Sequence, residues 1–383
     1  MAEASTPLKR DFALEVHMSR WEFSARYNMT ASDAESMTLA ELLSYAEPAD
    51  KAAFEALWLG YTETYGAPDL RQAIADTYEG LAAEDVLCFA GAEEGIYTAM
   101  RVLLGADDHA VVVTPNYQAA ETVPLSVCEV TGVPLEPDQG WTLDIDRVAA
   151  ALKTNTKLVS INFPNNPTGK ILEHDRFDAL VDLCRARDIW LFSDEVYRGI
   201  ERDPALRLPQ AADAYERGLS LGVMSKAYGL PGLRIGWIAC RDRALLARLE
   251  RYKHFTTICN AAPSERLALI ALNARQKLLA RTNRLAEANL ALTESFLADY
   301  AELFSWHRPE GACVGFVRYR GEEGVEDFAE RLVQEAGVLL LPASVYRSDL
   351  NPVPDDHFRI GFGRKDVEQG LATMRGWLQR NRP

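Results

Sequence analysis

Short apolar runs alternate with longer amphipathic segments through the middle of the chain. The central runs are almost continuously apolar, which is typical of parallel strands that helices bury on both faces. Seven runs are predicted as strands: Val86–Phe89, Ala110–Thr114, Val127–Val133, Leu158–Phe163, Ile189–Ser193, Leu219–Met224 and Ile235–Cys240. Four segments have the periodicity of helices: Asp69–Tyr78, Glu93–Leu104, Asp175–Arg187 and Arg243–Tyr252.

The pattern changes in the last third of the chain. One long helix is predicted from Pro263 to about Asp299, because this segment is rich in Ala, Leu, Arg and Glu. Beyond it, short glycine-rich strands and helices are predicted at Gly311–Tyr319, Val325–Glu335, Val338–Pro342, His357–Gly363 and Val367–Arg380. We therefore expect an α/β protein, with a large domain built on a mainly parallel seven-stranded sheet flanked by helices (residues 46–275). A smaller α+β domain (residues 276–383) is expected to pack against the N-terminal segment (residues 1–45).

Composition narrows the class of protein. The 383 residues carry a formal net charge of -15, so the chain lacks the basic surface that nucleic-acid binding needs. No run approaches the roughly 20 apolar residues of a membrane span, and the first residues lack the apolar core of a signal peptide. The scattered cysteines form no CxxC pair and the histidines no HExxH motif, which favours reduced thiols and no metal site. A cytoplasmic protein with no nucleic-acid or membrane partner is expected.

The segment Ser225–Gly236 contains the lysine that is best placed for chemistry. Lys226 follows a predicted buried strand inside a glycine-rich turn, and Arg234 follows it. Burial disfavours the ammonium form of a lysine, and a neutral amine can form a Schiff base with an aldehyde cofactor. The nearby arginine can hold that cofactor's phosphate. Because a lone lysine is usually a solvated surface group, this interpretation depends on the other segments.

Polar residues follow two more predicted strands. The segment Asn162–Gly169 places amides where open α/β sheets bind ligands, although Asn, Pro and Gly also form ordinary turns. Asp194 ends the next strand, and Tyr197 lies three residues later. A buried aspartate needs a partner, which a protonated pyridine nitrogen would supply, and a helix N-cap is the alternative role.

The turn Phe89–Gly95 joins a predicted strand to an amphipathic helix. Backbone N–H groups at the start of such a helix bind phosphate. The turn has neither a Walker A sequence nor a GxGxxG motif, so a nicotinamide dinucleotide is poorly supported. A short glycine turn is a weak signal by itself.

The order of these features is more informative than any one of them. A phosphate turn, Tyr117 in a Thr-Pro-Asn-Tyr segment, an Asn-Pro turn, an Asp…Tyr pair and a Ser-Lys…Arg segment follow one another. From about Leu57 to the C-terminus, the chain resembles fold-type I enzymes of the class I/II aminotransferase family, which depend on pyridoxal 5'-phosphate (PLP). The resemblance implies amino acid and 2-oxo acid substrates and a homodimer with active sites at the subunit interface.

The resemblance assigns roles to individual residues. It implies that Lys226 carries the Schiff base and that Asp194 pairs with the pyridine nitrogen. Asn166 and Tyr197 would bond the ring oxygen, and Tyr117 would stack on the ring. By the same resemblance, the catalytic residues are Lys226, Asp194 and Tyr197.

The remaining roles concern the phosphate and the substrate. Arg234 would grip the phosphate together with the turn Gly91-Ala92-Glu93, and Ser225 would complete the cofactor-binding set. Tyr61 resembles the tyrosine that reaches the phosphate of the neighbouring subunit. Arg359 resembles the arginine that binds the substrate α-carboxylate as a fork, beside Asn166.

Two phosphate donors that are common in the family are absent from this sequence. Val223 stands where the family commonly has a hydroxyl residue, three positions before the lysine. Ala92 and Glu93 stand where the turn usually has Ser or Thr, and Glu93 adds a negative charge unless it points away. Since each lost charged hydrogen bond costs roughly 1.5–3 kcal/mol, we expect weaker PLP retention than is usual.

The N-terminal segment also departs from the family pattern. The common glycine-containing entrance is replaced by a polar stretch, residues 28–36. The lysine motif and the region before Tyr61 resemble the capreomycidine synthase branch, which cyclises an arginine derivative. One hypothesis is that residues 28–36 line the substrate pocket, with Asp33 or Glu35 meeting a cationic side chain. The alternative is a polar loop with helix-capping residues.

Three functions stay open on the sequence alone. The first is an aminotransferase that moves an amino group between an amino acid and a 2-oxo acid. The second is a PLP-dependent cyclase, lyase or oxidase on the same scaffold, which would use the same Lys226 and Asp194. The third is a non-enzymatic amino-acid sensor, which the acidic charge and the lack of a helix-turn-helix disfavour.

Overall fold

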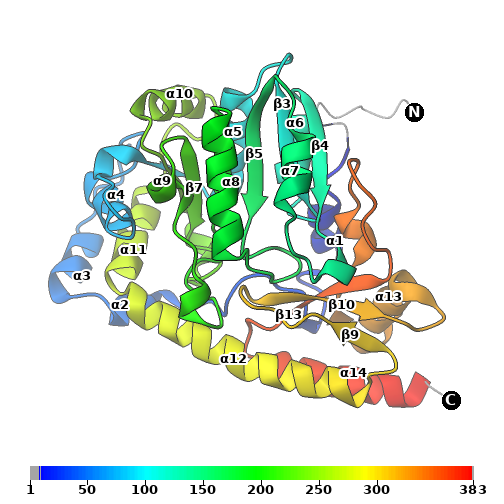
Figure 1. Cartoon of the computed structure of the whole chain (residues 1–383). Coiled ribbons are helices and arrows are strands. Elements are labelled where there is room, and N and C mark those ends of the chain that lie inside the picture. Colours follow the sequence, from blue (N-terminus) through cyan, green and yellow to red (C-terminus); the bar gives the residue numbers. More distant parts are fainter. Residues whose placement is uncertain (1–7, 9, 382–383) are drawn as a thin grey trace, which may run out of the picture.

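The computed structural model describes residue 8 and residues 10–381. Its largest sheet has seven strands in the order β2-β8-β7-β6-β5-β3-β4 (Figure 1). Their bounds are β2 Val86–Phe89, β3 His109–Thr114, β4 Glu129–Pro134, β5 Thr156–Asn162, β6 Trp190–Asp194, β7 Gly218–Val223 and β8 Gly236–Ala239. Strand β8 is antiparallel to both of its neighbours, and the other neighbouring pairs are parallel. The expected mainly parallel seven-stranded sheet is confirmed.

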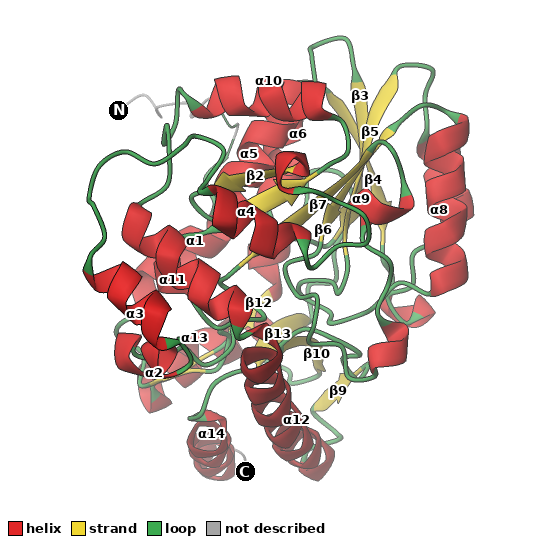
Figure 2. Ribbon diagram, turned by 90° about the vertical axis from the view of Figure 1, so that its left-hand side faces the viewer, coloured by secondary structure: helices red, strands yellow, loops and turns green. Residues whose placement is uncertain are grey.

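Helices cover both faces of this sheet, and Figure 2 shows α5 and α6 on one side and α8 on the other. Every residue of β2, β3, β6, β7 and β8 is consequently buried, which explains their unbroken apolar runs. The helices of this region are α4 Pro68–Ala75, α5 Ala92–Leu103, α6 Ala119–Leu125, α7 Ile145–Ala151, α8 His174–Ala186, α9 Ala211–Ala214 and α10 Arg243–Lys253. Helix α5 buries Ile96, Ala99, Met100 and Leu103, the spacing of one helix face.

A smaller antiparallel sheet lies below the large one in Figure 1, in the order β12-β13-β10-β9. Its strands are β9 Phe304–Trp306, β10 Val314–Tyr319, β12 Leu341–Pro342 and β13 His357–Gly361, and α13 Gly324–Ala336 and α14 Val367–Asn381 belong to the same region. The N-terminal segment forms α1 Ala13–Trp21, β1 Tyr27–Asn28, α2 Leu39–Ser44 and α3 Pro48–Glu55. Five short 3-10 helices complete the fold: η1 Ala83–Asp85, η2 Pro137–Gln139, η3 Pro204–Leu206, η4 Pro231–Leu233 and η5 Ala343–Tyr346. The domain boundaries at residues 45 and 275 stay predictions.

One predicted strand is wrong in its extent. The run Val338–Pro342 divides at Leu340 into β11 Val338–Leu339 and β12, which belong to different sheets. Strand β11 pairs in parallel with β1, so that Tyr27 faces Val338, whereas β12 pairs with β13. Because Val338, Leu339, Leu340 and Leu341 are all fully buried, the apolar pattern of this run gave no sign of the division.

The predicted helix from Pro263 to Asp299 is also wrong, because it is two helices. Helix α11 spans Ala262–Asn273 and α12 spans Arg275–Asp299, with Ala274 between them at φ -96° and ψ 11°. Most of α11 is buried beside the large sheet, whereas α12 runs beneath both sheets in Figure 1 and packs against α14. The break lets the chain change direction, and no glycine or proline marks it in the sequence.

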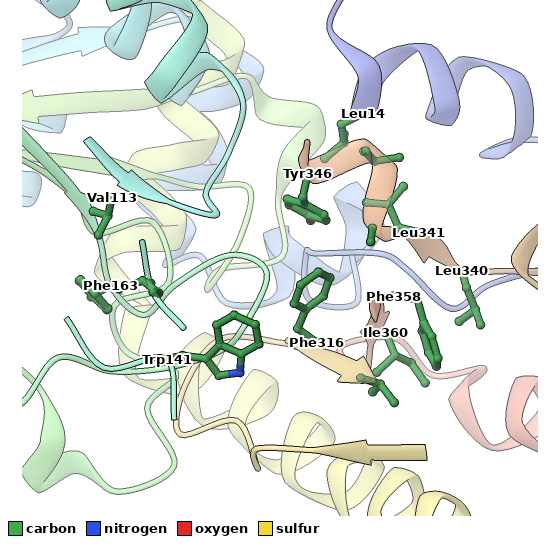
Figure 3. Close-up of a cluster of buried hydrophobic side chains, with 14 of the residues drawn as sticks. Leu14, Val113, Trp141, Phe163, Phe316, Leu340, Leu341, Tyr346, Phe358 and Ile360 are labelled. Atoms are coloured by element: carbon green, nitrogen blue, oxygen red, sulfur yellow. The ribbon is translucent and has the colours of Figure 1, made fainter. Parts of the chain in front are cut away.

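One continuous apolar cluster joins the two sheets (Figure 3). Val113 of β3 and Phe163, which follows β5, contribute from the large sheet, and Phe316 of β10 contributes from the small sheet. Trp141 lies between them, with its ring centroid 5.7 Å from that of Phe316. Because the interior is close-packed, this cluster fixes how the two sheets face each other across the site described below.

Candidate active site

The carboxyl ends of β5, β6 and β7 form what we call the floor of a cavity of ≈ 430 Å³. Asn162 ends β5 directly beside Asp194, which ends β6, and Val223 ends β7. Lys226 follows β7 by three residues. Parallel strands bring their carboxyl ends to one edge, so residues far apart in sequence line one cavity.

Most of the sequence-predicted site residues line this one cavity. They are Asp33, Ala92, Glu93, Tyr117, Asn166, Asp194, Tyr197, Ser225, Lys226, Arg234 and Arg359. Tyr61 lies outside it, and 85% of its surface is exposed to solvent. Within the described residues, no group of three or more His, Cys, Asp or Glu side chains is arranged to hold a metal ion. No described helix is both long and apolar enough to cross a membrane.

Lys226 reaches the N-terminal segment across the cavity. Its Nζ donates a hydrogen bond to Oγ of Ser32 at 2.8 Å. Burial lowers the pKa of Lys226, against the opposing effect of the carboxylates of Asp33 and Asp194. Lys226 therefore loses its proton more readily than a surface lysine does. The sequence did not single out Ser32, although the predicted stretch of residues 28–36 includes it.

Asp194 is buried without a cation in contact. Its Oδ1 accepts a hydrogen bond from the backbone N–H of Val196 at 3.2 Å. Burial raises the pKa of Asp194 to about 6, although Lys226 opposes this rise. A buried carboxylate of this kind lacks the charged partner that would repay its desolvation.

Tyr197 offers a second unused group next to Asp194. Its buried hydroxyl makes no hydrogen bond of ordinary geometry with the described residues. Burial raises the pKa of Tyr197, and the positive charge of Arg359 opposes the rise. The hydroxyl is therefore protonated at neutral pH and able to donate a hydrogen bond into the cavity.

Arg359 is buried among neutral acceptors. Its Nη1 donates to Oδ1 of Asn166 at 3.0 Å and to the hydroxyl of Tyr346 at 2.8 Å. Its Nη2 donates to the backbone oxygen of Thr30 at 2.7 Å. Because none of these partners is charged, the guanidinium keeps an uncompensated positive charge beside the cavity. Tyr346 was not predicted, since only the folded chain brings it next to Asn166.

The turn before α5 and Arg234 lie against each other. Gly91 has a φ of +93°, and a Cβ at this position would collide with the guanidinium of Arg234. Arg234 is exposed and forms no ion pair with any described residue. Nη1 of Arg234 donates to the backbone oxygen of Pro231 at 3.3 Å. The start of a 12-residue helix and a guanidinium without an ion pair together make a site for an anion.

Glu93 is aimed at the cavity rather than away from it. Its Oε2 is buried and has no hydrogen-bond partner among the described residues. Burial raises the pKa of Glu93 to about 7. The carboxyl is consequently partly neutral near pH 7, which softens its repulsion of an anion at the turn.

A helix from the N-terminal segment closes the opposite side of the cavity, and we call this side the roof. Leu14, Glu15 and Met18 of α1 and the next residue after α1, Glu22, line it. Glu15 accepts a hydrogen bond from the hydroxyl of Tyr117 at 3.3 Å. The side chain of Glu22 forms no hydrogen bond or ion pair with the described residues. Burial raises the pKa of Glu22, the positive charge of Arg364 opposes the rise, and Asp33 and Glu15 add to it.

The two acidic residues that were proposed from the sequence have partners already. Both carboxylate oxygens of Asp33 accept from Nη2 of Arg364 at 2.9 Å. Glu35 accepts from the backbone N–H of Lys365 at 3.0 Å and does not line the cavity. The charge of Asp33 is therefore compensated by Arg364, whereas neither Glu15 nor Glu22 forms an ion pair with a described residue.

These unused groups fit PLP. Asp194 lacks a cationic partner of the kind a pyridinium nitrogen provides, and Tyr197 has a hydroxyl free for a ring oxygen. The turn at Gly91 with Arg234 can take a phosphate, and Lys226 has an amine suited to an aldehyde. Each polar part of the cofactor therefore has a suitable group among the described residues that line or border the cavity.

Comparison with known proteins agrees with this geometry. Residues 29–372 match the model of the family "Aminotransferase class I and II". The chain is 30% identical over 360 residues to capreomycidine synthase from Streptomyces vinaceus, covering 92% of this chain and 90% of that protein. It is 30% identical over 330 residues to an arginine–pyruvate transaminase from Pseudomonas aeruginosa, covering 82% and 81%.

Solved structures show the same likeness. A PLP-dependent aminotransferase from Streptococcus suis superposes with a TM-score of 0.90 at 29% identity, covering 97% of this chain and 98% of that one. A PLP-dependent cyclase, OrfR, superposes with a TM-score of 0.88 at 26% identity, covering 97% of each chain. The sequence match and the fold agree along nearly the whole chain, and the protein therefore belongs to the aminotransferase class I and II family of fold-type I enzymes, whose cofactor is PLP.

Proposed function

We propose that this protein is an aminotransferase that moves an amino group between an amino acid and a 2-oxo acid. The observation that carries the proposal is the meeting of Lys226, Asp194 and Arg359 in one cavity. They supply an amine whose pKa is lowered, a buried carboxylate and an uncompensated guanidinium. Amino transfer needs all three groups. The amine acts on the Cα proton, the buried carboxylate pairs with the ring nitrogen of the cofactor, and the guanidinium binds the carboxylate of the amino acid.

When bound, PLP supplies an aldehyde that condenses with amino groups and a ring that withdraws electrons from the substrate Cα. Arg359 binds the α-carboxylate through its guanidinium, because its present partners are all neutral. Asp194 holds the ring nitrogen in its protonated form through its negative charge. The amine of Lys226 would take the Cα proton as a base and then return a proton as an acid, which together make the 1,3 proton shift of amino transfer.

A half-reaction tests this proposal directly. The PLP-loaded protein is mixed with single amino acids, and the visible absorption of the cofactor is followed while the products are identified. We expect a 2-oxo acid and stoichiometric pyridoxamine phosphate from the preferred amino acid. Consumption of the amino acid without any pyridoxamine phosphate would reject amino transfer.

A second candidate is a PLP-dependent cyclase, and two relatives favour it. The chain resembles capreomycidine synthase and the cyclase OrfR as strongly as it resembles aminotransferases. The same half-reaction separates the candidates, because a cyclase yields a ring-closed amino acid and leaves the cofactor as PLP. A lyase or an oxidase would also leave the cofactor as PLP, and the chemical identity of the product would distinguish these two activities from cyclisation.

The charges of the cavity support a cationic substrate side chain. In the proposed reaction Arg234 binds the cofactor's phosphate and Arg359 binds the substrate's α-carboxylate. Arg364 compensates the charge of Asp33. The roof carboxylates of Glu15 and Glu22 also line the cavity, and neither forms an ion pair with a described residue. A guanidinium or ammonium side chain would supply a cation, and one relative is named as an arginine transaminase. We therefore assign the cation-binding role to Glu22 in place of Asp33.

Exposed apolar residues near Tyr61 support a homodimer. Trp58, Leu59 and Phe255 are 78%, 78% and 89% exposed, which is unusual for large apolar side chains that are close to one another. A side-chain hydrogen bond links the two segments, because Oγ1 of Thr62 donates to the backbone oxygen of Asn260 at 2.9 Å. In the proposed dimer, Tyr61 reaches the phosphate in the partner subunit. Sedimentation at low concentration tests this, and a monomer that retains full activity would reject it.

A further inference from the structure

A second cavity, of ≈ 280 Å³, lies behind the floor of the active site. Val196 and Val223 line both cavities, so that only a thin wall separates them. The second cavity lies between the end of α4, the strands β7 and β8 and the start of α12. Nothing in the proposed reaction uses it.

Three arginines line this second cavity. Arg198 follows β6, Arg207 follows η3 and Arg275 begins α12, and all three are half-buried. Arg207 is paired with Glu201 through a contact of 2.8 Å. The other two donate only to backbone oxygens, Arg198 at 2.5 Å and Arg275 at 3.2 Å, and no described carboxylate lies within 4.0 Å of them.

The phenol of Tyr228 lines the same cavity as the three guanidinium groups. Each of the three lowers the pKa of Tyr228, although burial raises it overall to about 12. The hydroxyl is therefore protonated and makes no hydrogen bond with a described residue. Tyr228 lies two residues after Lys226, so a ligand that bonds this hydroxyl would touch the segment that carries the catalytic lysine.

Two carboxyls, those of Asp76 and Glu195, also line this cavity, and neither forms an ion pair with a described arginine. Asp76 is exposed and accepts from Nε2 of Gln72 at 2.8 Å. Glu195 is buried, and its Oε1 accepts from the hydroxyl of Ser220 at 2.9 Å, while its Oε2 has no partner among the described residues. Burial raises the pKa of Glu195 to about 7 against the opposing charge of Arg198, so near neutrality this carboxyl is partly protonated and repels an anion less than a full carboxylate would.

We propose that this second cavity binds a compact anion, either a phosphate or a small dicarboxylate, between Arg198, Arg275 and Tyr228. The planar forks of the two arginines match the paired oxygens of such anions, and the phenol supplies a third donor. The shared wall at Val223 and the place of Tyr228 beside Lys226 make the ligand a regulator of the active site. It is distinct from the cofactor's own phosphate, which would lie at Arg234.

Calorimetric titration of the PLP-loaded protein with inorganic phosphate, and separately with succinate, tests the proposal. The variant Arg275→Gln removes one fork, and Lys277→Gln is the matched control, since Lys277 is exposed on the same helix and does not line the cavity. We expect saturable binding at about millimolar concentration, weakened about 10-fold or more in Arg275→Gln and unchanged in Lys277→Gln. A third variant, Arg275→Lys, keeps the charge for folding and should bind with intermediate affinity.

The two probes also identify the source of the anion. Binding of phosphate alone indicates a phosphoryl ligand, and binding of succinate alone indicates a dicarboxylate. If succinate binds at Arg359 instead of in the second cavity, the substitution Arg275→Gln leaves its affinity unchanged. The proposal is overturned if neither probe binds, or if Arg275→Gln and Lys277→Gln bind both probes equally.

Discussion

The floor and the roof of the active-site cavity are built in different ways. The floor residues Asn162 and Asp194 are fixed by strand register, since they face each other in adjacent buried strands. The roof is a nine-residue helix, α1, whose N-cap makes no side-chain hydrogen bond, and the side chain of Glu22, which follows it, forms no hydrogen bond or ion pair with the described residues. The difference suggests that the floor carries the chemistry shared by the family, and that the roof carries the choice of substrate.

The largest expected effect comes from the floor, on replacing Lys226 by Ala. Without the amine there is no base for the Cα proton, and we expect the turnover rate to fall about 10²- to 10⁴-fold. Stopped-flow measurement of the half-reaction checks this. Full turnover in Lys226→Ala would show that another group is the base and would break the division between floor and roof.

The second effect concerns Asp194→Asn, which should act in opposite directions with and without cofactor. In the PLP-loaded protein it removes the partner of the ring nitrogen, and we expect turnover to fall roughly 10- to 100-fold. In the cofactor-free protein it removes a buried uncompensated carboxylate, and we expect a gain in stability at pH 7 of roughly 1–3 kcal/mol.

The pH dependence of that gain follows from the raised pKa of Asp194. The folded state favours the protonated carboxyl, so the carboxylate costs no stability below about pH 4, and its cost grows until the pH passes about 6. Urea unfolding of both cofactor-free proteins at pH 4 and pH 7 measures the difference. A stability gain at pH 4 as large as that at pH 7 would contradict the assignment.

The third effect belongs to the roof, through Glu22→Gln. If its carboxylate holds a cationic side chain, kcat/KM for arginine or lysine should fall about 5- to 10-fold while that for neutral amino acids stays within about 2-fold. Glu35→Gln is the matched control, because Glu35 is bonded to the backbone of Lys365 outside the cavity. Equal losses on basic and neutral substrates would remove the proposed cation site.

The smallest effect lies where the two regions meet, at Glu93. Burial raises the pKa of Glu93 to about 7, so it ionises as the pH rises through that value and then repels the cofactor's phosphate. We expect PLP to dissociate a few-fold faster at pH 8 than at pH 6, and Glu93→Gln to remove this dependence. Dialysis against cofactor-free buffer measures it. Stoichiometric PLP after long dialysis at pH 8 would contradict the expected weak retention.

The sequence predicted the floor better than the roof for a physical reason. Buried parallel strands are almost continuously apolar, so the polar residues at their ends, such as Asp194, stand out in the sequence. Partnerships between distant residues leave no such mark. Nothing near Asp33 reveals that Arg364 compensates it, and nothing near Tyr346 places it beside Asn166.

Local signals also failed where burial was uniform. The run Val338–Pro342 is apolar throughout, and only the pairing partners β1 and β13 show that it serves two sheets. The break at Ala274 lies between two good helix-forming sequences and depends on the packing of α11 in the core. In both cases tertiary contacts, rather than the propensity of the residues, set the ends of the elements.

The bonds of Arg359 to Thr30 have a consequence for synthesis on the ribosome. The two residues are 329 positions apart, so the guanidinium proposed to bind the substrate carboxylate is oriented by a part of the chain made long before it. Domains generally begin to fold while the chain emerges, and the seven strands of the large sheet, with Lys226 and Asp194, are complete by residue 239. The nascent protein thus has its lysine in place before it has a closed substrate site, and chains that stop before residue 359 would expose an unfinished one.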